Sequence, residues 1–127
     1  MKCVLLADSD DGGQTWGNVR IGSLNCGEMH GSAVQLPDGR FVLIHVHRVP
    51  WLRGGIRARI SCAEGNTWEK EMYYLNTTPA YPGYSANCVL PPHLADGKAG
   101  MILSIVGERA YAGCPPRIQA VRWRPVE

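Results

Sequence analysis

Three arginines that fall close together in the sequence could bind an anion. They are Arg48, Arg57 and Arg59. A guanidinium group matches a planar carboxylate through two parallel hydrogen bonds, so an arginine of this kind could belong to an anion clamp. Arg57 and Arg59 are two residues apart, which in a strand places both side chains on one face. The alternative is that each arginine makes an ordinary ion pair on a strand surface. Arg48 and Arg57 are the preferred clamp candidates.

Two histidines, His45 and His47, also share one strand face and could contribute to a metal site. A catalytic metal site needs a third protein ligand and an open coordination position. The sequence indicates no third ligand, and its five cysteines are widely spaced without a C-x-x-C pair. We therefore predict no metal and no cofactor, and we expect both histidines to face solvent or an interface.

Two tyrosines, Tyr81 and Tyr84, flank a Pro-Gly pair and could serve as flat surfaces for a sugar ring. Tyrosine also packs readily at the junction between two elements, because its ring is apolar and its hydroxyl is polar. Both interpretations remain open from the residue types. Combined with the arginines, the first interpretation predicts a carbohydrate or another small anion as ligand.

The element that must position these side chains is a turn at Ser9–Trp16, which has the pattern S-x-D-x-G-x-T-W. Asp11 can accept hydrogen bonds from nearby backbone N–H groups, while Gly12 and Gly13 tolerate positive φ. Trp16 is expected to anchor the exit of the turn by packing between neighbouring elements. The carboxylate of Asp11 would make its hydrogen bonds within the turn, so its predicted role is structural.

A second, damaged copy of this pattern lies at Ser61–Trp68. Ala63 stands at the position of the carboxylate and offers no acceptor, so we expect packing to hold this turn. The two copies are about 50 residues apart, a period typical of repeat architectures that include β-propellers.

The motif resembles the Asp box of sialidases and of the wider sialidase-like proteins with BNR repeats, in which each box joins the third and fourth strands of a propeller blade. His30–Arg40 resembles the opening strand and turn of a blade, and Gly55–Ser61 resembles its third strand. Tyr81–Ser85 and Ile118–Pro125 match the way such chains commonly finish. The resemblance covers nearly the whole chain and points to the last blades of such a propeller. The residues that match the box are Ser9, Asp11, Gly13, Thr15, Trp16, Ser61, Gly65, Thr67 and Trp68.

The resemblance implies an all-β fold, a partial sialidase-type propeller made of antiparallel sheets. Residues 1–25 would form half a blade, 26–75 a full blade with the degenerate box, and 76–127 a three-stranded last blade. Closing a propeller takes at least about four blades, or about 200 residues at this period, so this chain holds little more than two. The expected strands, in sets of two, four and three, are 3–8, 17–24, 32–36, 40–48, 56–61, 69–75, 84–90, 100–106 and 117–124.

The same resemblance suggests roles for individual residues. Tyr84, followed by Ser85, resembles the stretch that carries the sialidase nucleophile, and such a tyrosine needs a glutamate to take its proton. Glu108, expected beyond the second strand of its blade, is the nearest option. The first clamp arginine and the acid/base aspartate of the family have no counterpart here. The ligand-binding candidates are Arg48, Arg57, Arg59 and Tyr81.

We therefore expect a non-catalytic module that binds carbohydrate or another anion at the blade tops. One alternative is a sialidase-type exo-glycosidase that is active only as an oligomer. The other is a purely structural assembly subunit. Exposed blade edges are templates for pairing with another chain, so we expect a homo-oligomer joined through those edges.

Charge and composition exclude other classes of function. The net charge is +2 with arginines scattered among acidic residues, which gives no nucleic-acid footprint. No apolar run is long enough to span a bilayer, and the first eight residues are too short for a signal peptide core. An odd number of cysteines favours reduced thiols, and hence a cytoplasmic location.

Overall fold

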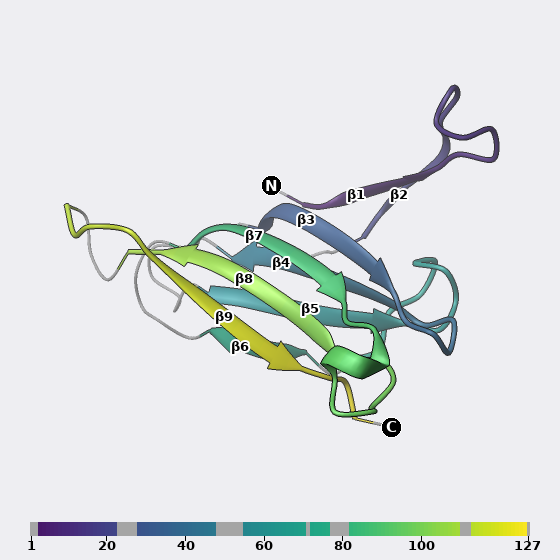
Figure 1. Ribbon diagram of the computed structural model, residues 1–127. Helices are drawn as coiled ribbons and strands as arrows, with labels where there is room; N and C mark the ends of the chain where they lie inside the picture. The colour runs from purple at the N-terminus through teal and green to yellow at the C-terminus, as the bar shows by residue number, and fades with distance from the viewer. Residues whose placement is uncertain are drawn as a thin grey trace.

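The computed structural model describes residues 3–22, 28–47, 55–70, 72–76, 82–109 and 113–126. These residues form nine strands and one short 3-10 helix, η1 (Figure 1). The strands are arranged as three antiparallel sheets in the orders β1-β2, β3-β4-β5-β6 and β7-β8-β9. The predicted all-β class and the grouping of two, four and three strands are confirmed, while a propeller stays a prediction. The bounds are β1 Leu5–Asp8, β2 Gly17–Ile21, β3 Glu28–Gln35, β4 Phe41–His47, β5 Gly55–Ser61, β6 Tyr73–Asn76, β7 Pro82–Val89, η1 Pro92–Leu94, β8 Ile102–Glu108 and β9 Arg117–Trp123.

Several strand boundaries differ from those expected, and three of them concern residues discussed below. β3 begins at Glu28 rather than at residue 32, because a shift of register between Met29 and Ser32 lets pairing with β4 continue past an irregularity. β6 is shorter than expected and begins only at Tyr73. β8 continues to Glu108, so this residue ends the strand instead of lying beyond it.

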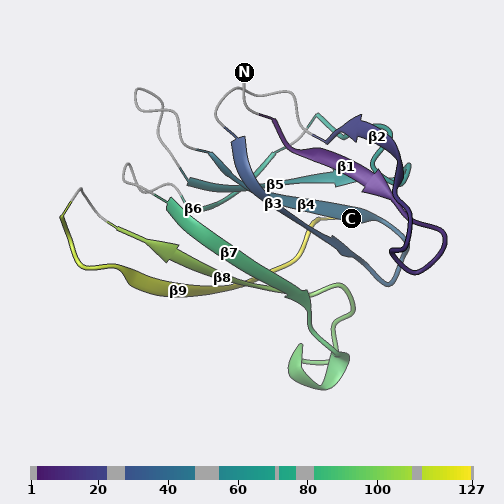
Figure 2. The ribbon, with the colours of Figure 1, turned by 90° about the horizontal axis from the view of Figure 1, so that it is seen from above.

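The three sheets stack face to face, with the four-stranded sheet in the middle (Figure 2). Its central strand β4 is buried from Val42 to His47, as the continuous apolar run of an interior strand predicts. One face of β4 and β5 packs against β8 to form the main core. The buried members of this core are Leu36, Val42, Ile44, Val46, Ile56, Ala58, Ile60, Ile102 and Val106.

The opposite face of the middle sheet is partly covered by the β1-β2 hairpin. A Cβ on Gly31 would lie 2.5 Å from the side chain of Val4, and a Cβ on Gly22 would lie 2.9 Å from that of Leu6. Both positions would also approach the Leu43 side chain to 3.3 Å. A side chain at Gly31 would collide with Val4 of the hairpin, and one at Gly22, within the hairpin, would collide with Leu6 and crowd Leu43 of the middle sheet.

The described part of the chain contains no helix suited by length and apolarity to crossing a membrane. Its four cysteines are all free thiols: Cys3, Cys62, Cys88 and Cys114.

Candidate functional site

The first turn is closed by its own side chains. Ser9 Oγ accepts a hydrogen bond from the Gly13 N–H over 2.7 Å, and Asp11 Oδ1 accepts one from the Thr15 N–H over 2.9 Å. The Thr15 hydroxyl donates to Asp11 Oδ2 over 2.7 Å, and the Ser9 hydroxyl donates to Asp11 Oδ1 over 2.9 Å. Hydrogen bonds from the Thr15 backbone and hydroxyl, and then from Ser9, lower the pKa of Asp11 to about 2. The carboxylate therefore stays ionised and serves the turn.

The second turn keeps the serine contact and replaces the aspartate contacts. Ser61 Oγ accepts hydrogen bonds from the Gly65 N–H over 2.9 Å and the Ala63 N–H over 3.1 Å. The carbonyl of Ala63 accepts from the backbone N–H and the side-chain amide of Asn66 over 2.9 and 3.0 Å. Glu64 adopts a φ of 51°, where the first turn has a glycine. Packing alone was expected to hold this turn, but backbone and serine hydrogen bonds also do so.

The tryptophans of the two turns lie differently. Trp68 and Trp16 each place a ring carbon near the turn glycine, 3.5 Å from a Cβ on Gly65 and 3.6 Å from one on Gly13. Trp16 is nevertheless 66% exposed, so the expectation that it packs between elements is wrong. The reason is that the loop of the β1-β2 hairpin projects beyond the sheets (Figure 1). Its indole N–H instead donates to the Gly13 carbonyl over 3.1 Å.

Sequence reasoning missed Arg20, which connects the two turns. Its Nη2 donates to the Glu64 carbonyl over 2.6 Å and its Nε to the Gly65 carbonyl over 3.4 Å. Its Nη1 pairs with Asp8 Oδ2 over 2.7 Å. The only sign of this role in the sequence was that Arg20 follows the first turn, at a position of the hairpin that faces inward.

The arginines predicted to form a clamp contact different groups. The Arg57 guanidinium lies 5.1 Å from the ring centroid of Tyr74, and its Nη1 lies 4.0 Å from the sulfur of Met72. Arg59 shares the same strand face, but its Nη2 donates to the Glu69 carbonyl over 3.5 Å, toward the second turn. Of these two arginines, Arg57 is therefore the better candidate for a ligand site at the strand ends that lie away from the two turns. The other candidates, Arg48 and Tyr81, fall outside the described residues.

The two histidines on β4 are buried, His45 at 0% exposure and His47 at 2%, so neither faces solvent, which was one of the two environments expected for them. His45 lies opposite Arg57 in the register of β4 and β5. Burial and then the charges of Arg57 and Arg59 lower the pKa of His45 to about 4. Burial and Arg57 also lower the pKa of His47. Both imidazoles are therefore neutral near pH 7, and the described residues contain no group of three potential metal ligands.

Tyr84 and Glu108, the proposed nucleophile and base, lie at the same end of the β7-β9 sheet but in different environments. Tyr84 is exposed, and its ring meets that of His30 edge to face at 4.4 Å between centroids. Glu108 is buried in the inward row of β8 and accepts a hydrogen bond from Arg117 Nε over 2.6 Å. Arg117 was not predicted; its position directly opposite Glu108 in the β8-β9 register was the missing information.

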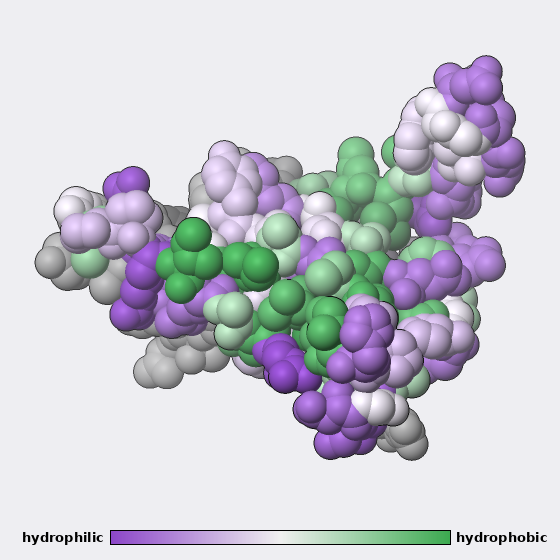
Figure 3. Space-filling view, in the orientation of Figure 1, coloured by the Kyte–Doolittle hydropathy of each residue, from purple (hydrophilic) through white to green (hydrophobic). Residues whose placement is uncertain are grey.

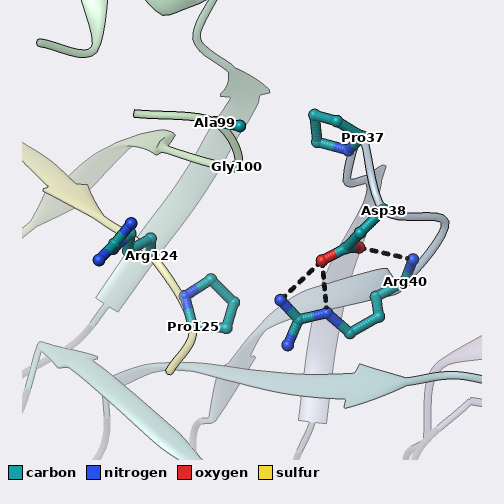
Figure 4. A pocket seen from close by; sticks show the side chains of 7 residues that line it. All are labelled: Pro37, Asp38, Arg40, Ala99, Gly100, Arg124 and Pro125. Atoms are coloured by element: carbon teal, nitrogen blue, oxygen red, sulfur yellow. Dashed lines mark hydrogen bonds and ion pairs between the residues drawn. The ribbon is translucent and has the colours of Figure 1, made fainter. Parts of the chain in front are cut away.

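One cavity of about 350 Å³ lies at the strand ends opposite to those that carry Arg57, Tyr84 and Glu108. Within this cavity the Nε and Nη2 of Arg40 contact Asp38 Oδ2 at 2.9 and 2.8 Å. This pairing lowers the pKa of Asp38. The Arg124 guanidinium points away from the pair (Figure 4). None of the predicted ligand-binding residues lines it. The lining residues are Pro37, Asp38, Arg40, Ala99, Gly100, Arg124 and Pro125.

A second cavity of about 440 Å³ lies beside the first turn. It is acidic, with an exposed indole at its side, and it would repel a carboxylate ligand. Its lining residues are Asp8, Asp10, Asp11, Thr15, Trp16, Gly17 and Asn18.

Comparisons of the chain with family models, with curated proteins and with solved structures found no match.

Proposed function

We propose that this chain is a segment of a sialidase-like β-propeller that binds a carboxylate-bearing sugar, or a related small anion, without hydrolysing it. The observation that carries this proposal is the position of Arg57. Its side chain is half-buried and its guanidinium lies over the Tyr74 ring, 5.1 Å from the ring centroid, which helps to hold it in place before a ligand arrives.

The neighbouring residues also favour an anionic ligand. His45, opposite Arg57, is neutral near pH 7, so the positive charge in this region comes from arginine. The strand ends that carry Arg57, Tyr84 and Glu108 all lie away from the two turns, which supports a ligand site at that side of the sheets. Tyr84 is exposed there and could contact a sugar ring.

Binding is preferred over catalysis because of the surroundings of Glu108. An activated tyrosine needs its base within hydrogen-bond reach and able to take a proton. Glu108 is buried, and its Oε1 accepts a hydrogen bond from Arg117 Nε over 2.6 Å, so this oxygen already has a partner other than Tyr84. The oligomeric glycosidase remains the alternative to be tested.

The binding proposal is tested by titrating the protein with sialic acid and following the change by NMR or calorimetry. We expect Arg57→Ala to weaken binding at least about tenfold, the loss of one charge-assisted pair. Arg124→Ala, which removes an exposed arginine at the opposite strand ends, should leave the affinity unchanged. The methyl ester of the same sugar should bind as weakly as sialic acid binds to Arg57→Ala.

Unchanged affinity in Arg57→Ala would remove Arg57 from the site and refute this placement. Hydrolysis of a fluorogenic sialoside by the pure protein, abolished in Tyr84→Phe, would establish the enzyme instead. Absence of turnover at high protein concentration is the result expected from the binding proposal.

A further inference from the structure

We propose that copies of this chain associate head to tail, with the outer face of β7-β9 in one copy packing on the outer face of β1-β2 in the next. This inference concerns a different surface from the ligand site and does not depend on it. The occupant proposed for each face is therefore a second copy of the same chain.

The outer face of β7-β9 is apolar. Alternation along β8 turns Ser104 and Val106 toward the middle sheet and Leu103 and Ile105 outward. On β9, Ile118 is 78% exposed. Figure 3 shows hydrophobic surface on this side of the molecule. The residues in the outward rows are Ala86, Cys88, Leu103, Ile105, Gly107, Ile118, Ala120 and Arg122.

Charge is nearly absent from this face. Within the outward rows just given, the charged side chain is Arg122, which pairs with Asp96 at 3.3 Å and donates to the Leu94 carbonyl over 2.8 Å. Its charge is therefore directed to the edge beside η1. An apolar sheet face of three strands is more typical of a contact surface than of a free one.

The outer face of β1-β2 has the same character. Leu5 and Ile21 lie opposite each other and are both exposed, and Val19 is 69% exposed. Leu6 and Arg20 form the inward pair that meets the middle sheet. The hairpin is thus covered on one face, and a two-stranded sheet gains little stability without a hydrophobic partner.

The two apolar faces lie at opposite ends of one stack (Figure 2). Inside the chain, β1-β2 packs on one face of the middle sheet and β7-β9 packs on the other. A second copy that places its β1-β2 face on β7-β9 would continue this face-to-face packing.

A head-to-tail contact accounts for both faces at once. A symmetric contact of β7-β9 with β7-β9 would leave Leu5, Val19 and Ile21 exposed. A contact between two different faces closes into a ring if the rotation between copies allows, and otherwise forms an open chain. The structure therefore points to a heterologous interface.

Two charge substitutions test this arrangement. Ile118→Lys disables the β7-β9 face, and Val19→Lys disables the β1-β2 face. Both side chains are largely exposed, so circular dichroism and melting should match the wild type. Val126→Lys, at a residue equally exposed but on neither face, is the matched control.

The readout is solution mass by sedimentation over a wide range of protein concentration. We expect the wild type and Val126→Lys to associate and each face variant alone to be monomeric. An equal mixture of the two face variants should form a heterodimer, because each supplies the face that the other lacks. A monomeric wild type at every concentration would overturn the proposal, as would full association of Val19→Lys alone or a mixture that stays monomeric.

Discussion

The guanidinium of Arg20 donates a hydrogen bond to the backbone carbonyl of Glu64 over 2.6 Å. Arg20 follows the first turn and Glu64 lies in the second, so this contact joins two copies of the same sequence pattern. The hairpin that carries the first copy is held on the middle sheet partly by the second.

Replacing Arg20 with alanine should therefore loosen the hairpin from the middle sheet. The side chain is only 16% exposed, and the change removes its ion pair with Asp8 together with its bonds to two carbonyls. We expect the free energy of unfolding to fall by about 2 kcal/mol, the range for hydrogen bonds to a charged group. Urea denaturation measures the change. Arg124→Ala should cost well under half as much, and an equal loss in both variants would contradict the role of Arg20.

The buried His45 predicts a loss of stability in mild acid. Its pKa is about 4 in the folded protein and 6.5 in the unfolded chain, so the unfolded chain binds the proton first as pH falls. Stability should decline from pH 6.5 to about 4, by on the order of 3 kcal/mol over the whole window. Denaturation midpoints measured across this window test the prediction. His45→Gln should flatten the decline, whereas an unchanged slope would show that another group causes it.

Asp11 organises the first turn, and its removal should act locally. In Asp11→Ala the Thr15 N–H loses its acceptor, so its amide should exchange with solvent faster than in the wild type. Asp10→Ala removes the neighbouring carboxylate and serves as control, with Thr15 exchange unchanged. The pKa of Asp11 is near 2, so the Thr15 protection should persist in mild acid and fade only as pH approaches that value. Amide exchange followed by NMR distinguishes the two variants.

The second turn should accept the carboxylate that it lacks. Ala63→Asp places an acceptor opposite Thr67, in the arrangement that Asp11 and Thr15 have in the first turn. We expect the free energy of unfolding to rise by about 1 kcal/mol, the net value of a typical hydrogen bond. Thermal melting measures the gain. Cys62→Asp adds the same charge one residue away and should give no such gain. An equal gain in both variants would mean that the added carboxylate does not act through Thr67.

The sequence, together with its resemblance to sialidase-like repeats, predicted the all-β class and the division of the strands into sets of two, four and three. These features are local: continuous apolar runs such as Val42–Ile44 mark interior strands, and glycine-rich turns such as Ser9–Trp16 separate them. The family resemblance itself, and the ligand site that it implies, remain predictions. The predicted ends of the strands were less accurate. Glu108, expected beyond β8, is its last residue, because pairing with the neighbouring strands sets where a strand ends.

Only the tertiary structure decided which side chains are buried. His45 is fully buried beside Arg57, its neighbour in the β4-β5 register, whereas Trp16 projects into solvent, and neither outcome follows from the residue types. Glu108 likewise acquires its partner Arg117 from the next strand. The physical reason is that burial and charge pairing depend on which sheet covers which face, and this is set by contacts between residues far apart in the sequence.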